Sequence, residues 1–231
     1  MFTLLSLQAD SLTAATSTAV IENVAPNTEI SVLEFILKGG VFLIPIAILL
    51  LYTFYVIAER YLYIDRASKI DDRLLRDVGE QLQSGNIELA RAIVERSTNA
   101  SSTIIKEGIL VIGRPIAEIE SNMDRAADIE IGQMEKHLGH LGLIAGIAPT
   151  LGFIGTISGV IKIFYSISVT ENISIGNISG GLYEKMISSG AGLIVGIIAY
   201  SAYHLLNGKI DNFALKVQKQ ILEFVNIIQR A

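Results

Sequence analysis

Residues 39–58 read GGVFLIPIAILLLYTFYVIA, and none of these side chains is charged. A helix of about 20 apolar residues is long enough to cross the hydrocarbon core of a bilayer, which is roughly 30 Å thick. Two further stretches, residues 137–161 and 186–208, also lack Asp, Glu, Lys and Arg. A single soluble domain is disfavoured because its buried helices rarely run this far without a charge. We therefore predict an all-α membrane protein with three transmembrane helices.

The composition agrees with a membrane protein and excludes several other classes. The 231 residues are 51% hydrophobic and 18% charged, with no cysteine and a net charge of −5, whereas soluble domains have roughly 25% charged residues. Disorder and a disulfide or thiolate-zinc framework are excluded. No basic patch interleaved with aromatic residues indicates a nucleic-acid partner. No nucleophile triad, phosphate loop or dinucleotide fingerprint is present, so we predict neither an enzyme nor a bound cofactor.

The positions of Lys and Arg predict the orientation, because these residues stay preferentially on the cytoplasmic side. Residues 1–37 and 163–183 contain none, whereas residues 60–136 contain 11, and the tail after the third span contains four more. We expect the N-terminus and the short second loop outside, and the long loop and the C-terminus in the cytoplasm.

The cytoplasmic segments have helical periodicity. In the long loop we expect breaks at residues 84–86 and 113–115, followed by one helix from about Pro115 to about Phe164, on the order of 75 Å long. The tail carries an apolar stripe at steps of three and four residues. The stripe is Leu206, Ile210, Phe213, Val217, Ile221, Phe224 and Ile228. We expect it to pack against the chain's own loop helices, or against another subunit, and the two are compatible.

Small residues form a narrow face on the second span. Gly152, Gly155, Thr156 and Gly159 are spaced by three and four residues, with Pro149 one turn before them. The third span repeats the pattern with Ser188, Ser189, Gly190, Gly192 and Gly196. Such faces allow close helix packing in a bilayer, and packing alone is one sufficient explanation.

Glu184 interrupts the apolar pattern at the start of the third span. A carboxyl group at membrane depth is costly and marks an ion or proton pathway, unless Glu184 and Lys185 lie at the outer interface. If the second span begins near His140 and the third near Ile178, a rise of 1.5 Å per residue places Thr156 ~24 Å from one side and Glu184 ~9 Å from the other. In a core of about 30 Å their depths are similar, so we expect that they share a cavity.

These segments are similar to those of a known family. APTLGFIGTISGVI, followed about 25 residues later by GGLYEKMISSGAGLIVGI, resembles the two signature segments of the MotA/TolQ/ExbB proton-channel family. KGGVFLIPI, ERYLYIDRASKI and the loop motif GRP extend the likeness over nearly the whole chain. Three spans with a large loop after the first resemble the ExbB/TolQ branch, and ExbB most.

The resemblance implies a function. It implies a homopentamer in the bacterial inner membrane around an ExbD-like dimer, whose single spans carry an aspartate. With a TonB-like protein, such assemblies use the proton-motive force to drive transport through the outer membrane. It also implies that Glu184 is the channel-lining glutamate, and that Thr156 and Ser189 supply the hydroxyls of the proton pathway. The packing or channel-lining residues it implies are Pro149, Gly152, Gly155, Gly159, Ser188 and Gly192.

The sequence departs from the family pattern at three positions and leaves alternatives open. Ser189 replaces a threonine, Lys185 replaces a small apolar residue, and Ile198 replaces a proline. A TolQ-like subunit of the Tol-Pal envelope-integrity system shares the same chemistry, and a non-conducting membrane scaffold is the alternative of another class. Lys162 either snorkels to the interface or pairs with Glu184.

His137 and His140 have a spacing at which two imidazoles can share a metal. No third ligand is evident, so we expect interfacial histidines and no metal site.

The predicted organisation has seven parts. Residues 1–34 form a periplasmic segment, for which a cleaved signal is the alternative. The rest are a first transmembrane helix at 35–59, a cytoplasmic helical loop at 60–136, a second transmembrane helix at 137–168, a periplasmic loop at 169–178, a third transmembrane helix at 179–207 and a cytoplasmic amphipathic helix at 208–231.

Overall fold

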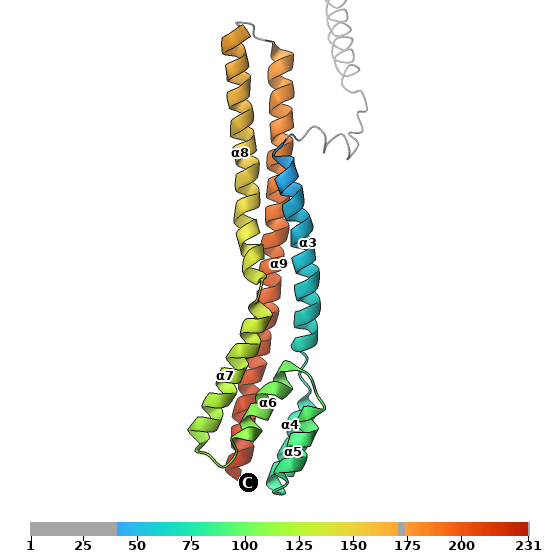
Figure 1. Ribbon diagram of the computed structural model, residues 1–231, viewed down its shortest axis with the longest axis vertical. Helices are drawn as coiled ribbons and strands as arrows, with labels where there is room; N and C mark the ends of the chain where they lie inside the picture. Colours follow the sequence, from blue (N-terminus) through green and yellow to red (C-terminus); the bar gives the residue numbers. More distant parts are fainter. Residues whose placement is uncertain (1–40, 171–173, 231) are drawn as a thin grey trace, which may run out of the picture. The chain divides into compact units, whose positions relative to one another are not determined.

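The computed structural model describes residues 41–170 and 174–230, and the predicted periplasmic segment 1–34 lies outside them. All regular secondary structure in these two ranges is α-helical. The helices are α3 (Leu43–Ala67), α4 (Asp72–Gln83), α5 (Ile87–Glu95), α6 (Ala100–Leu110), α7 (Ile116–Glu135), α8 (Leu138–Thr170) and α9 (Ile175–Arg230). Helices α8 and α9 run side by side and α3 packs against both, while α4–α7 gather around the C-terminal half of α9 (Figure 1).

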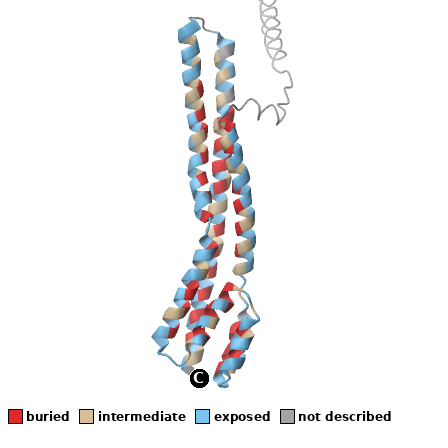
Figure 2. Ribbon diagram, viewed as in Figure 1, coloured by how far each residue is buried: buried red, intermediate tan, exposed pale blue. Residues whose placement is uncertain are grey.

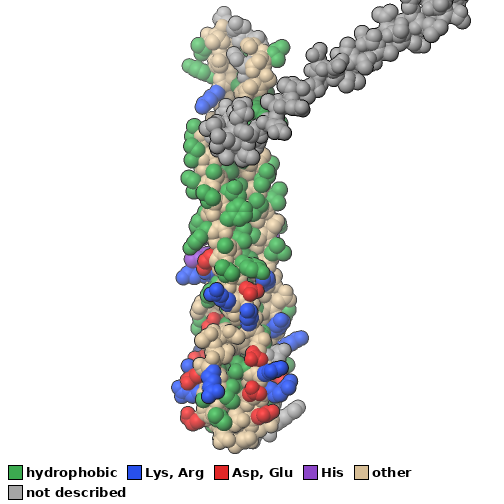
Figure 3. Space-filling view, turned by 90° about the vertical axis from the view of Figure 1, so that its right-hand side faces the viewer, with side chains coloured by type: hydrophobic (Ala, Val, Ile, Leu, Met, Phe, Trp, Pro, Cys, Tyr) green, Lys and Arg blue, Asp and Glu red, His purple; other side chains and the backbone are tan. Residues whose placement is uncertain are grey.

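Three segments of the described chain are long and apolar enough to cross a membrane, as predicted. They lie in α3, in α8 and in the first part of α9. The whole helices have 25, 33 and 56 residues, respectively. Figure 3 shows hydrophobic side chains covering the surface along these segments, and Lys, Arg, Asp and Glu gathered over the part formed by α4–α7. The division into an apolar and a charged half therefore appears on the surface as well as in the sequence.

The long helix predicted from Pro115 to Phe164 is wrong in one respect, because the chain leaves the helix at Lys136 and His137. His137 has a φ of +67°, the left-handed region that a non-glycine residue adopts only at a cost. Its carbonyl oxygen accepts a hydrogen bond from the His140 N–H at 3.1 Å, which starts α8. Hydrophobic periodicity continues through this junction, so the pattern does not reveal a break made by one residue's backbone.

The predicted breaks within the loop are confirmed. Gly85 and Gly113 adopt φ values of +76° and +95°, which suit glycine, and they separate α4 from α5 and α6 from α7. A further break between Glu95 and Ala100 was not predicted, and it gives α6 its own direction. In α6, the Ser101 hydroxyl donates to Oε1 of Gln220 on α9 at 2.6 Å, a buried link between the two helices.

The C-terminal stripe packs against the chain's own helices, as expected. Six of its members, Leu206 to Phe224, are buried in one core with side chains from α3–α8, and Ile228 is partly buried against it. Figure 2 shows buried residues on several helices of the lower part, where α9 contacts α4, α6 and α7. Phe213 and Phe224 are among the largest fully buried side chains. Burial of this apolar area accounts for the continuation of α9 far beyond the membrane segment.

Two carboxyl groups outside the predicted spans contribute to the pH dependence of stability with opposite signs. Burial raises the pKa of Glu130 on α7 above its ordinary value of 4.5. The stability gained by protonating it is present below the unfolded pKa and lost as the pH rises through the folded pKa. Glu130→Gln is therefore expected to unfold at a higher temperature than the wild type at neutral pH, and at the same temperature near pH 3, measured in detergent.

Glu95 supplies a control of opposite sign. The hydrogen bond from Arg91, followed by the charge of Lys106, lowers the pKa of Glu95, so its contribution is present at neutral pH and lost on acidification. Glu95→Gln is expected to lower the unfolding temperature at neutral pH only. The same offset at every pH for both variants would contradict this assignment.

Candidate functional site between helices α8 and α9

Helices α8 and α9 approach so closely that their backbones are in contact. A Cβ at Gly192 would lie 2.4 Å from the Ala148 carbonyl oxygen, and one at Gly152 would lie 2.9 Å from Cα of Ser189. Real Cβ atoms essentially never come so near to backbone atoms. Membrane helices lack a hydrophobic drive to associate, so such close contact is a main source of their packing energy. The small-residue faces of the two predicted spans therefore face each other within one chain.

The proline of α8 also lies in this contact. A Cβ at Gly196 would lie 2.6 Å from Cγ of Pro149. Gly155 is similarly close to the Ser188 hydroxyl and to Cβ of Phe42, at 3.0 Å and 3.2 Å from its own hypothetical Cβ. Pro149, Gly152 and Gly155 thus contact the chain's own α9 and the segment before α3.

Thr156 joins α8 to α9 at the level of the acidic residue. Its Oγ1 lies 3.3 Å from the carbonyl oxygen of Gly152 in its own helix and 3.3 Å from that of Lys185 in α9. The hydroxyl has one proton to donate to these acceptors, and its oxygen can still accept a hydrogen bond. Glu184 immediately precedes Lys185 in α9, so its backbone and Thr156 lie side by side. The direction of the Glu184 side chain lies outside what the structure describes.

Of the adjacent serines Ser188 and Ser189 in α9, Ser188 has the more unusual environment. Its side chain is fully buried, and within the described chain its Oγ has no hydrogen-bond partner. An unpaired buried hydroxyl costs about 1–3 kcal/mol, so it calls for a second polar group. Ser189, predicted for the proton pathway, is half-buried. The sequence indicated a packing role for Ser188, and its spacing gave no sign that its hydroxyl is unpaired.

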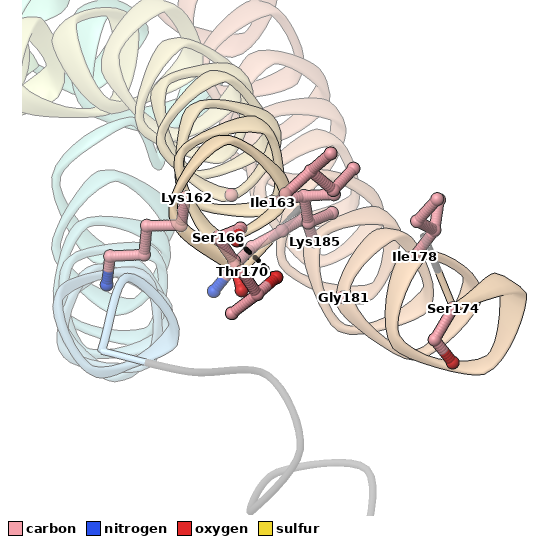
Figure 4. A pocket seen from close by; sticks show the side chains of 10 residues that line it. Lys162, Ile163, Ser166, Thr170, Ser174, Ile178, Gly181 and Lys185 are labelled. Atoms are coloured by element: carbon pink, nitrogen blue, oxygen red, sulfur yellow. Dashed lines mark hydrogen bonds between the residues drawn. The ribbon is translucent and has the colours of Figure 1, made fainter. Parts of the chain in front are cut away.

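Lys185 lies in a notch on α8 left by a glycine. A Cβ at Gly159 would come within 2.0 Å of Cγ of Lys185, so only glycine leaves room for the lysine chain. Figure 4 shows this chain crossing from α9 towards Ser166 and Thr170, while Lys162 extends along the other side of α8. Gly159 of α8 therefore leaves the space that Lys185 occupies, where the family pattern has a small apolar residue in place of the lysine.

His137 and His140 lie at the junction of α7 and α8. Their rings are stacked, with centroids 5.5 Å apart, and His140 Nδ1 forms a 2.8 Å hydrogen bond with the Tyr52 hydroxyl of α3. Arg60, two residues beyond the apolar part of α3, is buried beside Glu59 and donates to the Gln133 carbonyl oxygen at 3.2 Å. Within residues 41–170 and 174–230, no three His, Cys, Asp or Glu side chains gather as metal ligands would.

The fold and the site define a multi-pass membrane protein whose second and third spans pack tightly against each other, with the hydroxyl groups of Thr156 and Ser188 at their contact. Residues 88–219 match the family model described as the MotA/TolQ/ExbB proton channel family. The chain therefore belongs to this proton channel family.

Similar proteins carry ExbB and TolQ names. A biopolymer transport protein ExbB homolog of Methanothermobacter thermautotrophicus is 30% identical over 189 residues, which cover 81% of this chain and 67% of the relative. The biopolymer transport protein ExbB-like 1 of Synechocystis is 26% identical, over 75% of this chain and 70% of its own. The Tol-Pal system protein TolQ of Haemophilus influenzae is 27% identical over 47% of each chain.

Proposed function

We propose that this chain is an ExbB-like proton-channel subunit of the bacterial inner membrane. With an ExbD-like partner that carries an aspartate in its single span, it uses the proton-motive force to energise a TonB-like protein for import through the outer membrane. In the proposed orientation the N-terminus is periplasmic and the C-terminus cytoplasmic. The functional unit is a homopentamer.

One observation carries this proposal. Glu184 lies in the part of α9 that packs against the small-residue face of α8. The Thr156 hydroxyl donates to the carbonyl oxygen of the next residue, Lys185. Proton movement through a membrane protein needs a group that gains and loses a proton, together with polar groups that pass it on. Glu184 supplies the first, and the hydroxyls of Thr156 and Ser189 supply the second. The buried Ser188 hydroxyl is a further candidate for the polar chain.

Proton transfer in this scheme occurs between carboxyl groups. Glu184 takes up a proton from the periplasmic side, and it releases the proton towards the partner's aspartate or along the hydroxyls of Thr156 and Ser189. In this scheme the close packing of α8 against α9 holds these groups at similar depths in the membrane. The C-terminal part of α9 is anchored in the core of the loop helices by Phe213 and Phe224, and it supports the α8–α9 pair from the cytoplasmic side.

The proposal is tested by reconstituting the full chain into vesicles, with and without an ExbD-like partner, and following internal pH after a proton gradient is imposed. We expect proton flux with the partner present, and five copies of the chain in native mass spectra of the detergent-solubilised complex. Monomers under mild conditions, or no flux with the partner bound, would contradict the channel and favour the scaffold.

A TolQ-like role is the second candidate because the TolQ of H. influenzae is among the similar proteins. Expression in bacteria that lack either their own ExbB or their own TolQ separates the two roles. We expect restored uptake of iron complexes in the first strain. Restoration of envelope integrity alone, in the second strain, would assign the chain to the Tol-Pal system.

A further inference from the structure

One exposed side of α7 is acidic. The helix contains six acidic residues and one basic residue. Four of the acids recur at steps of four, four and seven residues, which places them on the same helix face. They are Glu120, Asp124, Asp128 and Glu135, which we call the acidic stripe, and all four are exposed. None of them forms an ion pair with another residue of the two described ranges, so the charge of the stripe is not neutralised there.

A basic surface lies on another side of the same region. Lys216 and Lys219 of α9 are exposed and line a cavity of about 290 Å³ together with Ile70, which lies between α3 and α4. Glu223 also lines this cavity, but within the described chain no ion pair joins it to either lysine. Helices α4 and α7 pack against different sides of α9 (Figure 1). One copy of the chain therefore carries an acidic and a basic surface on different sides.

The two surfaces lie at the same level along the helices. Helices α7 and α9 run antiparallel, and a Cβ at Gly108 would lie 2.6 Å from Met123 of α7 and 2.7 Å from Phe224 of α9. Five residues from this level, towards the membrane segments, stand Asp128 on α7 and Lys219 on α9. Because both helices rise about 1.5 Å per residue, these two residues are at equal height. Copies of one membrane protein share their orientation and depth, so groups of equal height can meet in a ring around an axis normal to the membrane.

Two exposed leucines flank Lys219 on the same face of α9. Leu215 and Leu222 lie four residues before and three residues after it, and they are 60% and 62% exposed. Lys219 lies ten residues, ~15 Å, beyond Lys209, the first charged residue after the third span. Lipid tails do not reach this far from the membrane segment. Another protein surface is therefore needed to bury these leucines.

We propose that the acidic stripe of one copy binds the face of Leu215, Lys219 and Leu222 on the next copy, with Lys216 at the edge of the contact. The contact repeats head to tail around the ring. A contact between two different surfaces of identical chains can close into a ring, whereas a two-fold dimer uses the same surface on both copies. Opposite charges select this pairing and oppose the pairing of like surfaces. The inference rests on the homopentamer of the proposed function, and it assigns one of the contacts that hold the ring.

Cross-linking between copies tests the contact directly. The chain has no cysteine, so a single introduced cysteine reacts alone. One full-length form carries Asp128→Cys and a second carries Lys219→Cys, with tags of different size, and the two are co-expressed and treated in membranes with a short bismaleimide. Any cross-link must join two copies because each copy has one cysteine. Glu88→Cys, on the exposed side of α5, replaces Asp128→Cys in the matched control.

We expect the mixed product of Asp128→Cys with Lys219→Cys to exceed both products that join two copies of one form, and to exceed the product of the control pair. A mixed product no more abundant than these would overturn the proposal. Proton flux and the number of copies are measured on the same variants. Five copies and normal flux without the mixed product would contradict this contact alone, whereas the mixed product without flux would support the contact and contradict only the channel.

Charge reversal provides a second test with its own rescue. Asp128→Lys or Lys219→Glu places like charges together at every contact of the ring, and we expect each to weaken a contact roughly fivefold. The two changes in one chain restore opposite charges at every contact, so we expect the five-copy species to recover in native mass spectra. Glu88→Lys is the control and is expected to assemble as the wild type does.

Circular dichroism of each variant checks that its helices are retained. A double variant that assembles no better than the single variants would overturn the proposal. Weakened assembly that appears only when the ExbD-like partner is present would assign the acidic stripe to that partner, and would also overturn it.

Discussion

Gly192→Ala is expected to destabilise the α8–α9 pair more than any other single methyl addition in the described chain. The added Cβ would lie 2.4 Å from the Ala148 carbonyl oxygen and 3.3 Å from Cα of Gly152, both backbone atoms that no side-chain rotation can move. The helices must separate, which loses packing along the whole contact. Overpacking of this kind costs about 1–3 kcal/mol, and a rigid backbone contact belongs at the upper end.

Two other glycines serve as controls for Gly192→Ala. A Cβ at Gly190 in α9, or at Gly146 in α8, meets nothing within 4 Å. Alanine favours a helix over glycine by up to about 1 kcal/mol, so Gly190→Ala and Gly146→Ala are expected to be neutral or stabilising. Thermal unfolding in detergent, followed by circular dichroism, ranks the three variants. A Gly192→Ala protein as stable as the other two would contradict the close approach of α8 and α9.

Much of this fold can be predicted from the sequence because its dominant interactions follow a helical period. The stripe from Leu206 to Ile228 predicts both the extension of α9 and its packing against the loop helices. The break at His137 is not predicted because it follows no helical period. It depends on one residue's backbone angle within a continuous apolar pattern, and histidine has no strong preference for that region.

The sequence singles out individual residues of the candidate site but not their pairings. Periodicity and the family likeness single out Thr156, Ser188 and Lys185 separately. Neither periodicity nor the family likeness reveals that Gly159 on α8 makes room for Lys185 on α9. Nor do they reveal that the Ser188 hydroxyl is buried without a hydrogen-bond partner in the described chain. Both features depend on the rotation of α8 against α9, which neither helix determines alone.

Glu184→Gln is expected to abolish proton flux through the reconstituted complex, to the level of protein-free vesicles, and with it the uptake of iron complexes in cells. Glutamine has nearly the size and shape of glutamate, but it cannot gain and lose a proton near neutral pH. Glu184→Asp keeps the carboxyl group on a shorter chain, and we expect partial flux from it. Flux is followed with a pH-sensitive dye inside the vesicles.

The matched control is Glu223→Gln. Glu223 lies on the same helix, exposed and well beyond the apolar segment, so the change removes the same charge without touching the α8–α9 contact. We expect wild-type flux from this variant. A loss of flux there as large as in Glu184→Gln would attribute the effect to net charge or assembly, and would contradict a specific role for Glu184.

Glu184→Gln also distinguishes a channel from a scaffold, because the two roles require different properties of residue 184. A scaffold needs only the packing of α8 against α9, and that packing is made by Gly152, Gly192 and their backbone neighbours, none of which the glutamine replaces. Glu184→Gln is therefore expected to assemble with the same number of copies as the wild type, by native mass spectrometry, while its flux is lost. Unchanged uptake in cells that express Glu184→Gln would contradict the proton pathway even if the oligomer forms.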